Sequence, residues 1–198
     1  MNFAFNEVEL PIRISLDRPI TDDELLRLSA ENDSLRLERD ANGELIVMSP
    51  TGTGGGRIET RVILELGIWA REDGRGEAAG SSTGFKLPDS SVRAADAAWV
   101  SLHRLNSVTA EHRKGYWPVC PEFVIEIHSE SDRLPELRTN MEEWIRNGAE
   151  VAWLIDPIEK AVTIYRPGDQ PEHLTHPTSV QGTRPIAGFE LVMSRIWD

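Results

Sequence analysis

The sequence contains a single cysteine, Cys120, among its 198 residues. One cysteine cannot form an intrachain disulfide, and it argues strongly against zinc sites built from cysteines. No apolar run approaches the roughly 20 residues that a membrane-spanning helix requires. The N-terminal MNFAFNEVEL also lacks the basic segment and apolar run of a signal peptide. We therefore expect a cytoplasmic protein that does not enter a membrane.

Basic residues are scarce relative to acidic ones. Lysine and arginine total 21 against 33 aspartates and glutamates, which gives a net charge of −12 and a pI near 4.9. Non-specific nucleic-acid binders are usually basic, because their affinity comes from neutralising phosphates. The composition therefore argues against a large DNA-binding face, although it permits a local basic cleft around an acidic metal site.

Several catalytic signatures are absent. The chain has no G-x-S-x-G elbow, and EHLTH does not match the H-E-x-x-H zinc motif. The glycine-rich TGTGGG at 51–56 lacks the Gly-Lys-Ser/Thr ending of a phosphate-binding loop, so we interpret it as a connector. Four histidines fall in expected loops, where solvated side chains are usual: His103, His112, His173 and His176.

Length and patterning predict one α/β domain over residues 1–198. Thr21 is expected to cap a helix in ITDDELLRLSAEN, and LRLERDANGELIVMSP has the pattern of a β-hairpin. The expected helices and strands that follow are a helix at 57–72, two strands around a Pro-Asp turn in 84–102, a strand at 122–128, a helix at 134–147, and strands at 150–157 and 161–168. The C-terminal PIAGFELVMSRIWD fits either a short strand or a short helix.

The expected strand EFVIEIH carries a glutamate among apolar residues. Side chains alternate along a strand, so Val124, Glu126 and His128 share one face. A buried carboxylate costs several kcal/mol or more unless it is paired, protonated or bound to metal. Glu126 is therefore expected to meet a partner on that face.

A second acidic residue, Asp96, lies in the apolar segment RAADAAWV and shares a face with Ala98 and Val100. Two carboxylates on adjacent buried strands repel each other, which raises one pKa unless a cation lies between them. Magnesium suits such a pair, because it takes one or two carboxylates plus water and can polarise a phosphoryl oxygen. The alternative is that Asp96 or Glu126 ends its strand facing solvent.

These blocks, in their order, resemble the Uma2 family, a branch of the PD-(D/E)xK nucleases. The resemblance is carried by LSAENDSLRLERDANGELIVMSPTG, SSTGFKLPDSSVRAADAAWVSLHRL, CPEFVIEIHSESDRLPELRTNMEEWIRNGAEVAWLIDP, IYRPG and IAGFEL. It implies a restriction-endonuclease-like core at about 50–168, with a mixed central sheet flanked by helices. A helix and β-hairpin would extend this core at the N-terminus.

The resemblance assigns Asp96 and Glu126 to the two acidic positions of the family and implies Mg²⁺ or Mn²⁺ as cofactor. The family's lysine often lies in a helix segment resembling LRxKMEEY, where this chain has LRTNMEEW and therefore Asn140. Its role of stabilising phosphate charge must then pass to another residue or be lost.

Three substitutes for that lysine are candidates. His128 lies two residues after Glu126, where the wider superfamily places its lysine, and Lys86 lies on a strand expected to pair with the Asp96 strand. Arg138 is a weaker option. Glu59, expected in the first turn of the helix at 57–72, is a further candidate metal ligand. The alternatives are that His128 is a histidine at the end of a strand, and that Lys86 and Glu59 are solvated charges without a role in catalysis.

Two functions of different class follow. The first is a magnesium-dependent endonuclease acting on DNA, expected to be a homodimer because such nucleases commonly dimerise to cut two strands. The second is a nuclease fold that has lost cleavage and acts as a binding or regulatory module, which Asn140 and the acidic charge favour. Pairing of Glu126 with an arginine such as Arg138 would support the second.

Overall fold

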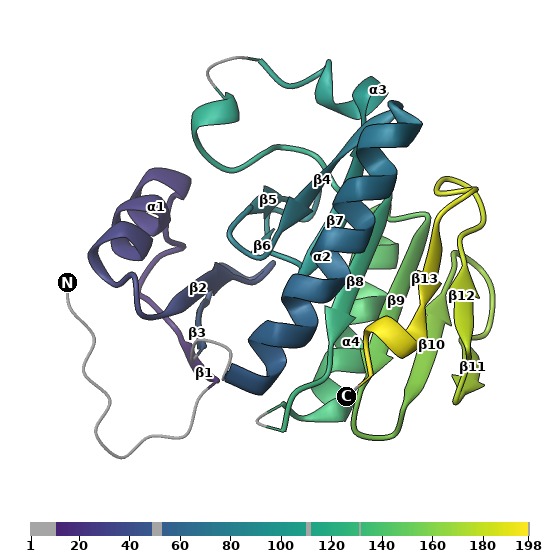
Figure 1. Ribbon diagram of the computed structural model, residues 1–198. Coiled ribbons are helices and arrows are strands. Elements are labelled where there is room, and N and C mark those ends of the chain that lie inside the picture. Colours follow the sequence, from purple (N-terminus) through teal and green to yellow (C-terminus); the bar gives the residue numbers. More distant parts are fainter. Residues whose placement is uncertain (1–10, 49–52, 110–111, 131, 198) are drawn as a thin grey trace.

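The computed structural model describes residues 11–48, 53–109, 112–130 and 132–197. Its centre is a six-stranded sheet in the order β11-β10-β9-β8-β7-β4, in which β8 and β9 are parallel and the other neighbours antiparallel (Figure 1). Its strands are β4 (Gly76–Gly80), β7 (Ala97–Ser101), β8 (Phe123–Ile127), β9 (Val151–Asp156), β10 (Ala161–Tyr165) and β11 (Glu172–Thr175). The expected mixed central sheet of an α/β nuclease core is confirmed.

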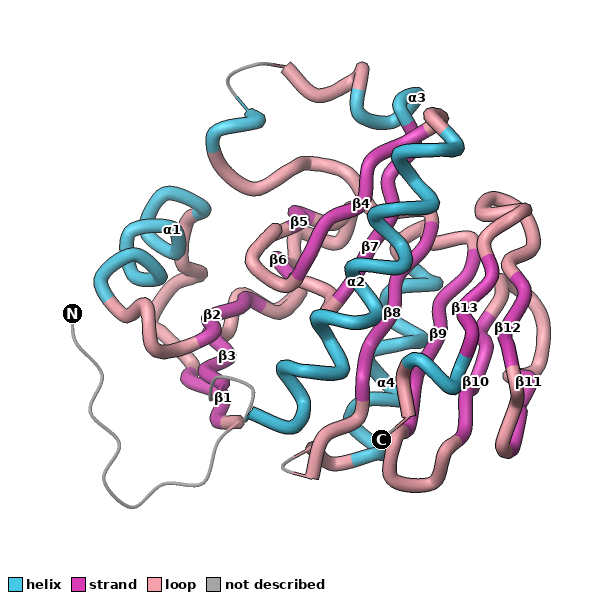
Figure 2. The backbone as a smooth tube through the Cα atoms, in the orientation of Figure 1, coloured by secondary structure: helices cyan, strands magenta, loops and turns pink. Residues whose placement is uncertain are grey.

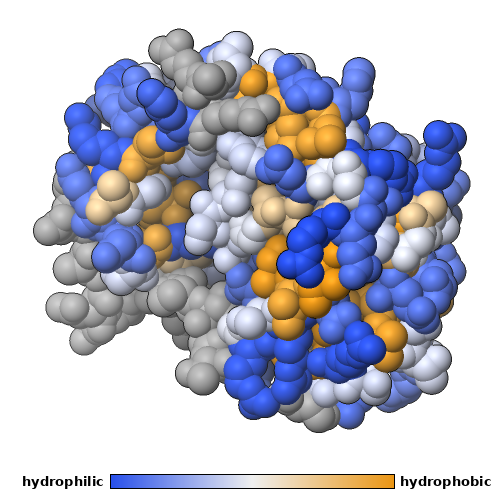
Figure 3. All heavy atoms as spheres, turned by 45° about the horizontal axis from the view of Figure 1, so that its top comes forward, coloured by the Kyte–Doolittle hydropathy of each residue, from blue (hydrophilic) through white to orange (hydrophobic). Residues whose placement is uncertain are grey.

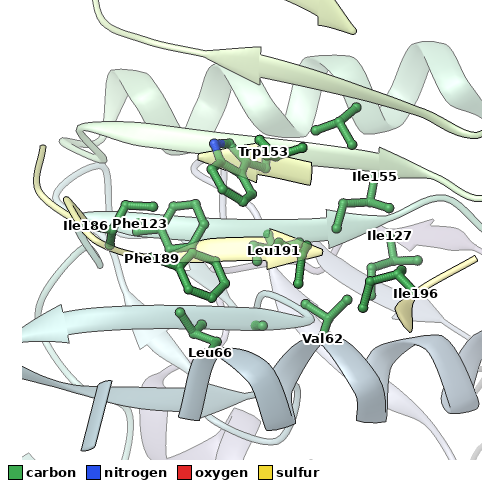
Figure 4. Packing of buried hydrophobic residues seen from close by; sticks show 14 of the residues in the cluster. Val62, Leu66, Phe123, Ile127, Trp153, Ile155, Ile186, Phe189, Leu191 and Ile196 are labelled. Carbon is green, nitrogen blue, oxygen red and sulfur yellow. The ribbon is translucent and has the colours of Figure 1, made fainter. Parts of the chain in front are cut away.

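Two helices cover opposite faces of this sheet, α2 (Thr53–Asp73) and α4 (Leu134–Arg146). On the α2 side, Val62 and Leu66 pack with Phe123 of β8 in one apolar cluster (Figure 4). On the α4 side, Met141 packs with Val124 in a second cluster. Alternation along β8 therefore splits its side chains between two cores, as the sequence pattern predicts.

The N-terminal part forms a separate five-stranded sheet with helix α1 (Asp22–Glu31) beside it (Figure 2). The sheet order is β1-β3-β2-β6-β5, with β1 (Ile12–Ile14), β2 (Arg36–Arg39), β3 (Leu45–Met48), β5 (Phe85–Lys86) and β6 (Val92–Arg93). Thr21 caps α1 in a reciprocal capping box with Glu24, which confirms the expected helix start. The expected hairpin is β2–β3, and Gly43 turns it at a φ of 84°.

The C-terminal tail forms both of the alternatives that its sequence left open. A strand, β13 (Glu190–Val192), pairs with β12 (Ser179–Gln181), and a single 3₁₀ turn, η2 (Met193–Arg195), follows it. Phe189 and Leu191 from this tail join the apolar cluster under α2. The segment between β7 and β8 contains a short helix, α3 (Leu102–Leu105), and a 3₁₀ turn, η1 (His112–Lys114).

Two expectations about local structure were wrong. Helix α2 begins at Thr53, inside the glycine run expected to be a connector, whose first two residues, 51–52, lie outside the described residues. Lys86 lies on β5, which pairs with β6 and not with β7. The strand that pairs with β7 on that side is β4, whose GEAAG sequence has low β-propensity and is held in the sheet by its partner.

No described helix is long and apolar enough to cross a bilayer.

Candidate active site

Strands β7 and β8 bring the two candidate acids together. The register pairs Ala97 with Ile125 in antiparallel fashion, so the preceding Asp96 lies beside Glu126 one step further along the ladder. Glu126 is buried, with 7 % of its surface exposed, and the Asp96 side chain is 13 % exposed. The solvent-facing alternative for these two carboxylates is therefore wrong.

Asp96 is held at both carboxylate oxygens. Its Oδ2 accepts a hydrogen bond of 2.8 Å from the backbone N–H of Ile127, and its Oδ1 lies 3.2 Å from Nη1 of Arg36. Burial raises the pKa of Asp96 and the nearby charge of Glu59 adds to the rise, although Arg36 and the Ile127 N–H oppose it. One guanidinium and one backbone donor therefore do not fully offset the cost of burying this charge.

Glu126 has a neutral partner, and no arginine of the described residues forms an ion pair with it. Its Oε1 accepts a hydrogen bond of 2.9 Å from the indole Nε1 of Trp144 on α4. Burial and the charge of Asp96 raise the pKa of Glu126 to about 8, against the weaker opposing effects of Arg36 and Trp144. The expected partner on this strand face is thus an indole N–H. Arg138, the arginine considered as an alternative partner, forms no ion pair with Glu126 within the described part of the chain.

A chain of ion pairs, partly buried, extends from Arg36 beside the two acids. Nη2 of Arg36 lies 3.1 Å from Oε1 of Glu38, and Nη1 of Arg93 lies 3.0 Å from Oε2 of the same residue. Arg93 also pairs with Glu143 on α4. Burial alone would lower the pKa of Arg36, but the charges of Glu38 and of the two acids raise it overall, so Arg36 stays charged.

The acids line a cavity of about 740 Å³ between the two sheets and α4. Eight carboxylate side chains and three arginines line this cavity, so its wall is acidic unless cations enter. Asn140 lies on the wall together with Asp96 and Glu126. The position that the resemblance assigns to a lysine therefore lines the same cavity as the two acids.

Glu59 also lines the cavity, from α2. It accepts a hydrogen bond from the hydroxyl of Ser81, and its charge contributes to the raised pKa of Asp96. Because α2 begins at Thr53, Glu59 lies in the second turn of the helix and not in the first, as we expected. It lies close enough to influence the acidic pair without being bonded to it.

Two expected substitutes for the lysine lie elsewhere. Nζ of Lys86 is 2.6 Å from Oδ2 of Asp22 on α1. Nδ1 of His128 is 3.1 Å from Oδ2 of Asp156, although the two are not aligned as a hydrogen bond. Neither side chain lines the cavity, because β5 holds Lys86 in the N-terminal sheet and His128 contacts the end of β9.

The residues present suit a hard divalent ion. Among the described residues, no group of three or more His, Cys, Asp or Glu side chains is arranged to hold a metal. Magnesium nevertheless needs only one or two carboxylates, with water completing its shell. The raised pKa values of Asp96 and Glu126 both indicate incompletely compensated negative charge, which a cation would relieve.

Sequence reasoning missed the residues that surround the acids. Arg36 and Glu38 alternate with apolar Leu37 in LRLER, which places both on one face of β2, and this pattern could have marked them. Trp144 was not singled out, because nothing in the sequence distinguishes an indole that donates to a carboxylate from one in an apolar core. The contacts depend on how the two sheets meet.

The comparisons with known proteins concern the family and the fold of the chain. A family model, Uma2, described as "Putative restriction endonuclease", matches residues 22–194. A solved structure from Anabaena variabilis, described as "a putative nuclease belonging to DUF820", superposes with a TM-score of 0.73 at 21 % identity, covering 90 % of this chain and 98 % of that one. At this identity the likeness shows a shared fold. No functionally curated protein matches the chain.

Proposed function

This chain belongs to the Uma2 family, and from that membership we propose that it is a divalent-metal-dependent endonuclease that hydrolyses phosphodiester bonds in DNA. One observation carries the proposal. Asp96 and Glu126 lie side by side on the wall of an open cavity, and the pKa of each is raised. A buried acidic pair of this kind is costly unless a cation shares it.

Asp96 and Glu126 would hold the ion, which we propose to be Mg²⁺ or Mn²⁺. Such an ion supplies a Lewis acid for the phosphoryl oxygen and lowers the pKa of bound water. The Ile127 N–H fixes one Asp96 oxygen, and the Trp144 N–H fixes one Glu126 oxygen. In hydrolysis, water oxygen bonds to phosphorus, the bond to one sugar oxygen breaks, and that oxygen takes up a proton. Glu59, which lines the same cavity, would add a further carboxylate for the ion or for a water bound to it.

The acidic wall of the cavity opposes the binding of DNA. Without metal, the eight acidic side chains on this wall outnumber its three arginines and disfavour a phosphate backbone, so we expect DNA binding to depend on divalent ions.

We also propose that the protein is a homodimer in the cytoplasm, because a dimer brings two sites to the two strands of a duplex. Leu64 and Ile68 lie one turn apart on the outer side of α2 and are exposed. Figure 3 shows hydrophobic patches on a mainly hydrophilic surface. Light scattering in solution tests the dimer.

The test of cleavage is a titration of Mg²⁺ and Mn²⁺ with supercoiled plasmid. Wild-type protein should nick the plasmid, and Asp96→Asn, which keeps the shape of the side chain, should lose at least about a hundredfold in rate. Glu122→Gln is the matched control, because Glu122 is also buried and pairs with an arginine, Arg104, away from the cavity. Equal nicking by wild type and Asp96→Asn would remove the assignment.

A second function, a binding or regulatory module without cleavage, also has support. Asn140 supplies no charge, and the side chains of Lys86 and His128 contact other residues. A module of this kind would bind DNA or another partner in the presence of metal but leave the plasmid intact. The same titration, combined with a binding assay, separates the two functions.

A further inference from the structure

The proposed nuclease site lacks an obvious cation to stabilise charge on the phosphate. Asn140 holds the family's lysine position, and Lys86 and His128 lie outside the cavity. Phosphoryl transfer is catalysed mainly by positioning and by electrostatic stabilisation, so an active site needs such a group. The cation must then come from a residue that the sequence did not single out.

Arg36 is the guanidinium that contacts the acidic pair. It reaches Asp96 at 3.2 Å from β2 of the N-terminal sheet, and its charge also acts on Glu126. It lines the cavity, and its side chain is 26 % exposed. Arg93 and Arg133 line the same cavity, but Arg93 is engaged by two glutamates and Arg133 pairs with one on the exposed start of α4.

The bonding of Arg36 is incomplete. Its Nε is buried and has no hydrogen-bond partner among the described residues. A buried donor without a partner is destabilising, so a side chain that served only to neutralise carboxylates would be expected to satisfy it. The guanidinium thus keeps one donor that no described residue uses, and a shift of the side chain could bring it to a ligand.

Arg36 can move away from Asp96 while its other partner, Glu38, keeps hydrogen-bond donors. Glu38 also accepts a bond of 3.0 Å from Arg93 and one of 3.0 Å from the backbone N–H of Ala94. A metal ion on Asp96 would take over the charge compensation that Arg36 provides. The guanidinium would then be free to face an anion in the cavity.

We propose that Arg36 is a catalytic residue that takes the place of the missing lysine. It neutralises Asp96 in the metal-free protein and donates to the scissile phosphate when metal occupies the carboxylates. A guanidinium suits this role because it stays charged and presents a fork of donors that matches phosphate oxygens. The inference rests on the proposed nuclease function.

The test compares Arg36→Gln with wild type in three assays: plasmid cleavage, Mn²⁺ binding by calorimetry without DNA, and thermal unfolding. We expect kcat to fall about 10²–10³-fold, as for removal of one transition-state donor. Mn²⁺ should bind at least as tightly as to wild type, because Arg36 no longer competes for Asp96. The double variant Arg36→Gln with Asn140→Lys should recover at least about tenfold of the lost kcat.

The matched control is Arg104→Gln. Arg104 is also 26 % exposed and pairs at 3.0 Å with a buried glutamate, Glu122, away from the cavity. It should lose stability without a comparable loss of kcat. Should Arg36→Gln fail to fold, Arg36→Lys keeps the charge but loses the fork of donors, and we expect at least about a fivefold lower kcat at unchanged metal affinity.

Three results would overturn the role of Arg36 while leaving the nuclease function standing. They are an Arg36→Gln kcat within about threefold of an active wild type, a loss of Mn²⁺ affinity in that variant, and no recovery in the double variant. If Arg36→Lys is the variant studied, a kcat equal to that of the wild type would overturn the proposed role of Arg36. A wild-type protein that cuts no DNA with any metal removes both proposals.

Discussion

The indole Nε1 of Trp144 donates a hydrogen bond of 2.9 Å to Oε1 of Glu126, and both side chains are buried. This contact joins helix α4 to strand β8 at the candidate metal site. It is the one direct hydrogen bond between the Glu126 carboxylate and another side chain that the described structure contains. The orientation of Glu126 therefore depends on a residue whose sequence context suggests only packing.

Trp144→Phe removes this donor while keeping an aromatic ring. We expect Mn²⁺ affinity to fall about tenfold, because a hydrogen bond to a charged group contributes roughly 1.5–3 kcal/mol. Calorimetric titration measures the change. Trp153→Phe is the matched control, since Trp153 is equally buried but packs in the cluster on the opposite face of the sheet. Equal losses in both variants would contradict a role for the Glu126 contact.

Glu126 also makes stability depend on pH in the metal-free protein. Burial and the charge of Asp96 raise its pKa from 4.5 to about 8, so the folded protein keeps a proton that the unfolded chain releases. The stability that this proton provides is complete below pH 4.5 and is lost as pH rises through about 8. Glu126→Gln should flatten this part of the profile, and urea unfolding in EDTA at about pH 5, 7 and 9 measures it. Parallel profiles for the variant and wild type would show that Glu126 is ionised throughout.

Sequence patterning predicted the sheet and the acidic pair because these depend on local alternation. The apolar face of FVIEI and the small residues of RAADAAWV placed Glu126 and Asp96 on neighbouring strands. The cation was not predicted, because Arg36 lies 60 residues from Asp96 and reaches it only through the packing of two sheets. Strand β4 was missed for a related reason, since its Gly and Ala residues have little β-propensity and owe their place to the pairing with β7.

Lys86 and His128 should not be required for cleavage. Lys86 pairs with Asp22 where both are partly exposed, and such surface pairs contribute about 0–1 kcal/mol. Lys86→Met and His128→Gln should therefore keep kcat within about threefold of wild type in the plasmid assay. A loss of about tenfold or more in either, with unchanged thermal unfolding, would restore that residue as a catalytic candidate.

Asn140→Lys tests whether the site is complete without the family's lysine. Asn140 lies on the cavity wall with Asp96 and Glu126, so a lysine there could reach a bound phosphate. We expect kcat for plasmid nicking to rise about tenfold, because the added charge supplements that of Arg36. If wild type is inactive and only this variant cuts, the natural protein is a degenerate nuclease.

Thr139→Lys separates a local effect from a general gain of charge. Thr139 precedes Asn140 on α4 but is exposed and does not line the cavity, so a lysine there alters the net charge by the same amount without facing the acids. The weaker repulsion of DNA should then affect binding in both variants alike, whereas kcat should rise only in Asn140→Lys. An equal rise in both would show that overall charge, and not a cation beside the acidic pair, limits the reaction.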